Sequence, residues 1–109
     1  MHLEIYEKLI EVARAGSITN YTEVGKIAGL NMESPADRNL IAAILDEINI
    51  YEDQQGRPML SAVVVRQDEN MPGAGFFECA RQLGRYQGSD DLVFWAHELT
   101  EVHHHWCSH

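Results

Sequence analysis

The chain has 109 residues, of which 45% are apolar and 23% charged, and this size suits one compact domain with a single hydrophobic core. Seventeen acidic and eight basic residues give a net charge of −9, so binding to nucleic acid through a basic surface is not expected. No apolar run approaches the roughly 18 residues of a membrane span, and the acidic, amphipathic start is unlike a secretory signal. Two widely separated cysteines, Cys79 and Cys107, are too few for a disulfide scaffold and indicate reduced thiols in a cytoplasmic protein.

The N-terminal half predicts three helices. Residues 3–15 place apolar side chains on one helical face and charged ones on the other, and Gly16 is a typical stop. A shorter helix is expected over residues 21–29. The third helix has the clearest start, because Ser34 suits an N-cap and Pro35 suits the first helical position, and an apolar stripe then runs to about Tyr51.

The C-terminal half predicts a β-hairpin followed by two helices. The β-branched run of residues 59–65 is the best strand candidate, residues 67–70 supply a turn, and residues 71–76 form a short return arm. A short helix is expected over residues 76–84. The last helix starts at Asp90 and carries an inner stripe that begins at Leu92, while its acids, Glu98 among them, are expected on the solvated side.

Helix, short helix, longer helix and strand pair is the element order of a winged helix-turn-helix domain. We therefore expect a mostly helical α+β fold with a small β-hairpin and two additional C-terminal helices. The whole chain, residues 1–109, is predicted to form one domain, with a winged-helix-like core at 3–77 and a helical extension at 78–109.

Three segments resemble the DNA-binding half of alkylguanine-DNA alkyltransferases and alkyltransferase-like proteins. They are GSITNYTEVGKIAGL at 16–30, RPMLSAVVV at 57–65 and GAGFF at 73–77. The resemblance covers somewhat more than half of the chain and implies a winged-helix fold. It also implies an arginine finger at Arg38, at the start of the third helix, with Tyr21 and Asn39 as further nucleic-acid contacts.

The reactive centre of that family is missing from this chain. Where the family has a reactive cysteine followed by histidine, this sequence has Ser61 followed by Ala62. A serine without an adjacent base is a poor nucleophile, because its proton must be removed as it attacks. We therefore expect no alkyl transfer, no enzymatic activity and no cofactor.

Arg38 has an ordinary alternative, which is an ion pair with Asp37 or with an acid one helical turn away. The carboxylates of the third helix also oppose an approach to DNA. The sequence thus favours a non-enzymatic interaction module, an inhibitor or regulator of a nucleic-acid-binding protein, whose carboxylates imitate a phosphate backbone. The alternative, which the resemblance implies, is an alkyltransferase-like protein that reads damaged or distorted DNA without alkyl transfer. The carboxylates assigned to this protein-binding surface are Asp46, Glu47, Glu52, Asp53, Asp68 and Glu69.

Aromatic residues offer a second kind of partner surface. Tyr51, Tyr86, Phe94 and Trp106 do not all fit the inner stripes of their helices, and Trp106 is assigned to the partner-binding surface. A homodimer through the last helix would bury Phe94 and Trp106 together. The C-terminal histidines are adjacent in sequence and cannot all face one ion, so no metal site is expected.

Overall fold

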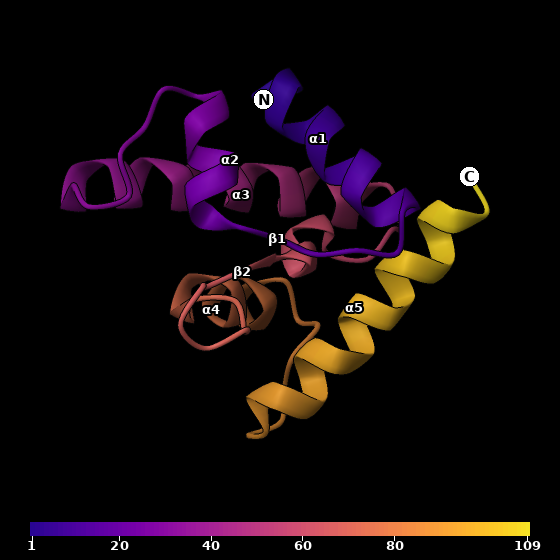
Figure 1. Cartoon of the computed structure of the whole chain (residues 1–109). Helices are drawn as coiled ribbons and strands as arrows, with labels where there is room; N and C mark the ends of the chain where they lie inside the picture. Colours follow the sequence, from indigo (N-terminus) through magenta and orange to yellow (C-terminus); the bar gives the residue numbers. More distant parts are fainter.

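The computed structural model describes residues 1–109, and its helices surround a short central segment that carries the second strand (Figure 1). The elements in chain order are α1 (Leu3–Arg14), β1 (Thr19–Asn20), α2 (Tyr21–Ile27), α3 (Pro35–Gln54), the 3-10 helix η1 (Leu60–Val63), β2 (Val64–Val65), α4 (Ala74–Gln82) and α5 (Asp91–Cys107). The fold is mostly helical with a small sheet, which agrees with the predicted α+β class. None of the helices combines the length and the apolar character needed to cross a membrane.

Helices α2, α3 and α5 begin where the sequence predicts them, because side chains cap their first turns, whereas α4 has no side-chain cap and begins at Ala74, two residues before the predicted start. Asn20, Ser34 and Asp90 each accept a hydrogen bond from a backbone N–H three residues further on. The end of α3 differs from the prediction, since the helix continues beyond Tyr51 to Gln54. Glu52 and Asp53 of this last turn pair with Arg57 and Arg85, and Gly56 then ends the helix with a positive φ of 72°.

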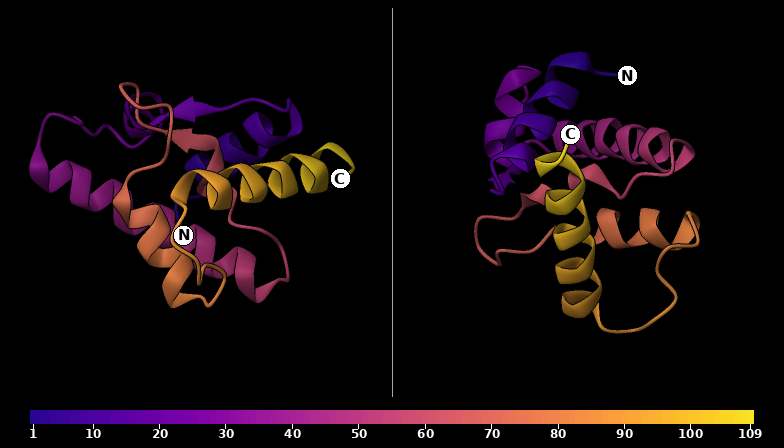
Figure 2. Two further views of the ribbon diagram at one scale, coloured as in Figure 1. Left: turned by 90° about the horizontal axis from the view of Figure 1, so that it is seen from below. Right: turned by 90° about the vertical axis from the view of Figure 1, so that its right-hand side faces the viewer.

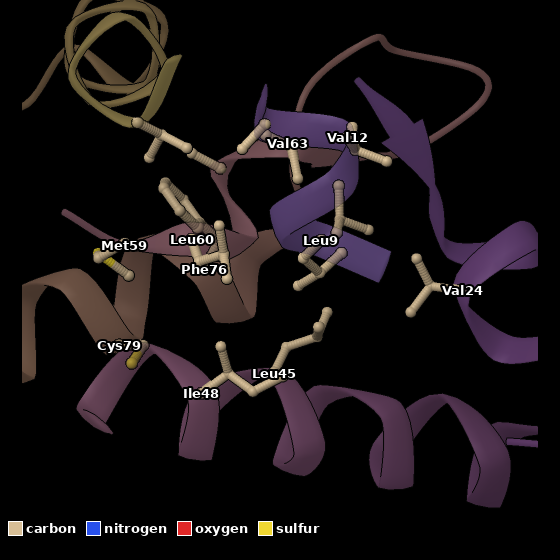
Figure 3. Close-up of a cluster of buried hydrophobic side chains, with 14 of the residues drawn as sticks. Leu9, Val12, Val24, Leu45, Ile48, Met59, Leu60, Val63, Phe76 and Cys79 are labelled. Carbon is tan, nitrogen blue, oxygen red and sulfur yellow. The ribbon is translucent and has the colours of Figure 1, made fainter. Parts of the chain in front are cut away.

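A single hydrophobic core joins all of the elements except β1. Twenty buried residues form it, and every residue from Met59 to Val65 is buried, so η1 and β2 run through the middle of the protein. Leu45 and Ile48 point from α3 toward Leu9 of α1 and Leu60 of η1 (Figure 3). The apolar stripe of α3 thus packs against the buried centre of the protein. The adjacent face of the helix remains available for a functional site.

The predicted β-hairpin is wrong. Only Val64 and Val65 of the expected strand are extended, and they pair in parallel with Thr19 and Asn20 instead of with residues 71–76. The segment after β2 is a loop, closed by a hydrogen bond from the Arg66 N–H to the Met71 carbonyl at 2.8 Å. The β-branched run reflects burial on all sides rather than a long strand, and Pro72, the second residue of the expected return arm, has no N–H to donate.

Helix α5 packs against α1 and η1, and α4 packs against α3 (Figures 1 and 2). The predicted inner stripe of α5 is correct at Val102 and Trp106, but Leu92 is 56% exposed because the first turn extends beyond the core. The prediction for Glu98 is also wrong, because this side chain is buried. Its carboxylate accepts hydrogen bonds from the Met59 N–H at 2.9 Å and from the Arg85 guanidinium at 2.9 and 3.1 Å.

Candidate functional site

The protein has one cavity, which we call the α3 cavity, with a volume of about 240 Å³. It is lined by Tyr21, Met32, Arg38, Ile41, Ala42, Leu45, Asp46, Ser61, Arg66, Gly73, Gly75 and Phe76. This volume is that of roughly eight liquid waters and lies below the range of about 300–1,000 Å³ typical of sites for drug-sized ligands. The α3 cavity therefore suits a single ring system more than an extended molecule.

One face of α3 forms the longest wall of the cavity. Arg38, Ile41, Ala42, Leu45 and Asp46 are separated by three, one, three and one residues, which places them on one side of the helix. Arg38 lies near the start of α3 and Asp46 two turns further on, so the wall carries a cation at one end and a carboxylate at the other. The apolar residues between them line the middle of this wall.

Tyr21, the first residue of α2, closes the side opposite this wall together with the segment before α4. Its hydroxyl oxygen accepts a hydrogen bond from the Gly73 N–H at 2.8 Å. A Cβ at Gly73 would lie only 3.4 Å from that oxygen, so glycine permits the close approach. Burial raises the pKa of Tyr21, which keeps the phenol protonated and able to donate a hydrogen bond of its own.

The Arg38 side chain is exposed and has no carboxylate partner. Its guanidinium makes one long contact, 3.5 Å from Nη1 to the Met32 carbonyl oxygen, and it takes part in no ion pair. Asp37, the expected partner, instead accepts a hydrogen bond from the Asn31 N–H at 2.9 Å. The predicted ion pair with Asp37 or with a nearby acid is therefore wrong, and Arg38 is available to a ligand. Asn39 is exposed beside it and does not line the cavity.

Ser61 lies in η1, buried and on the cavity wall, and is held there by Asn49 of α3. The Asn49 amide group donates to the Ser61 hydroxyl at 2.7 Å and accepts from the Ser61 N–H at 3.1 Å. Both residues are buried, so the pair fixes the position of η1 relative to α3. An uncharged amide cannot take the serine proton, so this partner orients Ser61 without activating it.

Asp46 and Cys79 are neighbours beside the cavity. Burial raises the pKa of the Cys79 thiol to about 11, and the Asp46 carboxylate adds to this effect. Burial likewise raises the pKa of Asp46. The thiolate is the reactive form of cysteine, and the raised pKa keeps Cys79 in its thiol form. Cys79 is therefore unreactive and contributes to core packing.

We predict that only Cys107 reacts with iodoacetamide in the folded protein. At about pH 8 a pKa near 11 leaves roughly one Cys79 thiol in a thousand ionised, and the side chain is buried, whereas Cys107 is exposed. Intact-mass measurement should show one adduct in buffer and two in urea, and a Cys107→Ser variant should show none in buffer. Two adducts forming at similar rates in buffer would contradict this placement of Cys79.

The six carboxylates assigned to the acidic surface do not form one continuous exposed row. Glu52 is fully buried and ion-paired with Arg57 at 2.6 Å, and Asp53 pairs with Arg85 at 3.3 Å. Asp46 lines the cavity, Glu47 pairs with the N-terminal amine at 2.7 Å, and Asp68 and Glu69 pair with Arg66 at 3.2 and 3.3 Å.

The aromatic residues mostly complete the core. Trp106 is only 7% exposed, so its assignment to an exposed partner-binding surface is wrong. Tyr86 is buried and stacks on Phe94 at 4.4 Å between ring centroids, which uses both rings inside the protein. Tyr51 alone of the four remains exposed. Trp106 is thus turned into the core while Phe94 is half-buried, and the homodimer through the last helix stays a prediction.

The C-terminal histidines point in different directions. His103 contacts the Ser17 carbonyl at 2.8 Å, and His105 stacks on His109 at 4.2 Å between ring centroids. No group of three or more histidine, cysteine, aspartate or glutamate side chains in this chain is arranged to hold a metal ion.

Comparison of the chain with protein-family models, with curated proteins and with solved structures finds no match. The function must therefore be inferred from the α3 cavity. Tyr21, Arg38 and Ser61, which the sequence singled out, all line it, whereas Asn39 does not. The role of Asp46 as a cavity residue was missed, although its spacing of eight residues from Arg38 is a signal that both share one helix face.

Proposed function

We propose that this protein binds a single base extruded from DNA in the α3 cavity, as an alkyltransferase-like reader of damaged or distorted DNA. The observation that carries the proposal is that Tyr21, Arg38 and Ser61 line one cavity. They come from three separated segments of the chain, and the resemblance assigns each of them to the neighbourhood of the nucleic acid or of the reactive centre.

The size and lining of the cavity support a base as the ligand. An extruded base needs a pocket with apolar or aromatic walls and a few polar groups that meet its edge. Tyr21 and Phe76 supply aromatic rings, Met32 an apolar side chain, and the Ser61 hydroxyl a polar group. Met32 packs over Gly25, where a Cβ would lie 2.9 Å from its methyl group, so Gly25 sets the room available to this side chain.

Arg38 supports contact with the DNA outside the cavity. It is exposed and has no carboxylate partner. A guanidinium in this setting can meet a phosphate or fill the space that an extruded base leaves in the duplex. The negative charge of the rest of the protein would restrict binding to this local contact and would make it weak on undamaged DNA.

The proposal is for binding without group transfer. Ser61 has Asn49 as its side-chain partner, and the buried Cys79 thiol has a raised pKa. A damaged base would thus be held but not repaired by this chain alone.

The second candidate is the acidic interaction module, and the net charge of −9 favours it. Exposed carboxylates on α1, such as Glu4, Glu7 and Glu11, are more accessible than most of the six assigned from the sequence. In this case the partner is a basic protein, and DNA would compete with the chain instead of binding it.

Fluorescence anisotropy with labelled duplexes tests the proposal. We expect a duplex containing a mismatch or an alkylated guanine to bind more tightly than a plain duplex, with an affinity that falls as salt rises. Arg38→Ala should weaken binding by about tenfold or more. Lys26→Ala removes the same charge from an exposed site on the neighbouring helix that does not line the cavity, and it should change the affinity much less.

The outcomes separate the two candidates. No binding to any duplex at low salt would overturn the DNA-reading proposal and leave the acidic module. Equal losses in Arg38→Ala and Lys26→Ala would show a diffuse charge effect and would remove the specific role of Arg38.

A further inference from the structure

Asp46 is a carboxylate on the cavity wall that has no cationic partner. Among the ion pairs of the protein none involves Asp46, and the charged group that acts on it most strongly is another acid, Glu78. The two arginines of the α3 cavity do not neutralise it. Arg66 is paired with Asp68 and Glu69. Arg38 lies eight residues away along α3, a rise of about 12 Å.

The ionised form of this carboxyl destabilises the fold. Burial raises the pKa of Asp46 above its usual 3.8. Because the folded-state pKa is the higher one, stability falls as the pH rises from about 3.8 through the raised value, and the full penalty remains at neutral pH. An acid without a cationic partner on the wall of a cavity is a candidate functional group. A ligand that brings a positive charge would remove the penalty.

The rest of the cavity is suited to a flat cation. The rings of Tyr21 and Phe76 and the thioether of Met32 line it with Asp46. Aromatic faces attract a cation, most strongly when both are removed from water. A carboxylate with two aromatic rings in a space of about 240 Å³ is a combination that favours a charged ring over a neutral one.

We infer that the α3 cavity selects a positively charged base, such as an adenine alkylated on a ring nitrogen, over the neutral base. Asp46 faces the charged ring, Tyr21 and Phe76 contact its faces, and Arg38, at the far end of the same helix wall, contacts the phosphate backbone. The inference names the class of base for the proposed DNA-reading function and in that respect rests on it.

Free nucleosides test this inference without requiring contact with DNA. The probes are 1-methyladenosine, which is cationic at neutral pH, N6-methyladenosine, which carries the same added methyl group but is neutral, and adenosine. We expect 1-methyladenosine to bind about tenfold or more tightly than either neutral nucleoside, measured by isothermal titration calorimetry. Chemical-shift changes in a parallel NMR titration should centre on residues of the cavity.

Matched variants assign the preference to Asp46. Asp46→Asn should bring the affinities for the cationic and neutral nucleosides close together. It should also melt no lower than the wild-type protein at neutral pH, because it removes a partly buried charge that has no cationic partner. Glu47→Gln removes the adjacent, exposed carboxylate and should keep the preference.

Equal affinity for the three nucleosides, binding of none of them, or a preference that survives Asp46→Asn would overturn the inference. Its failure can be distinguished from that of the proposed function. If duplex binding depends on Arg38 but the protein does not distinguish the nucleosides by charge, only the inference fails and the proposed function stands. If the protein binds the cationic nucleoside selectively but binds no duplex, the DNA-reading function fails and the cation preference stands.

Discussion

Replacement of Glu98 by alanine is expected to lower the free energy of unfolding by about 3 kcal/mol. The Glu98 carboxylate is 3% exposed and accepts bonds from the Met59 N–H and from two nitrogens of Arg85. Its removal leaves a buried N–H without a partner and leaves Arg85 with Asp53 alone. Because Arg85 is partly exposed and can regain water, we expect the loss at the lower end of the range for buried pairs.

Glu101→Ala is the matched control for this prediction. It removes the same side chain from the same helix one turn later, where the carboxylate is exposed and pairs with His97 at 3.8 Å. Urea unfolding followed by circular dichroism should show less than about 0.5 kcal/mol for this variant. If the two variants lost similar stability, Glu98 would not be the buried link between α5, η1 and the segment after α4.

Replacement of Leu9 by alanine is expected to cost about 3 kcal/mol through the cavity that it leaves in the core. Leu9 is fully buried and lies opposite Leu45 and Ile48 of α3 (Figure 3). The surrounding helices are held by further core contacts and can fill the space only in part. The large loss follows from both the removed apolar surface and the unfilled volume.

Leu3→Ala provides the comparison on the same helix, since Leu3 is 63% exposed. Its loss of unfolding free energy should stay within about 0.5 kcal/mol under the same urea titration. Equal losses for Leu3→Ala and Leu9→Ala would contradict the face that α1 presents to the core.

The helices could be predicted from the sequence because their signals are local. Ser34 and Asp90 cap the first turns of α3 and α5, and apolar residues recur at helical spacing behind them. The pairing of β1 with β2 could not be predicted, since its two residues per strand lie 45 positions apart and leave no pattern of their own. The short β-branched run around Val64 then favoured a hairpin, although its burial comes from packing on all sides.

Buried charges were the other feature that the sequence did not reveal. Glu52 and Glu98 belong to runs of polar residues that are typical of exposed helix faces, and each is buried and paired with an arginine outside its own helix, Glu52 with Arg57 and Glu98 with Arg85. Of the cavity, Tyr21 and Arg38 could be predicted through the family resemblance. Asp46 was assigned to an acidic surface, because its place beside Ser61 depends on how η1 packs on α3.

The net charge favours a basic protein as the partner, whereas the cavity favours DNA. The ion pairs within the protein lessen this disagreement. Four of the six carboxylates in the predicted acidic surface are paired with arginines, two of them through Arg66 at the edge of the cavity. Arg38 is not neutralised in this way. Arg38 is thus a guanidinium without a carboxylate partner in a chain whose total charge is −9.

A ¹H–¹⁵N NMR titration of the wild-type protein with a short duplex that contains one alkylated base tests the central claim most directly. We predict that the largest chemical-shift changes lie at the amides of the α3 cavity, including Ser61, Gly75 and Phe76, and that Arg38→Ala abolishes them at the same DNA concentration. Absence of any change, or changes spread over the exposed acids of α1 with the cavity unaffected, would contradict the claim that this cavity is the binding site.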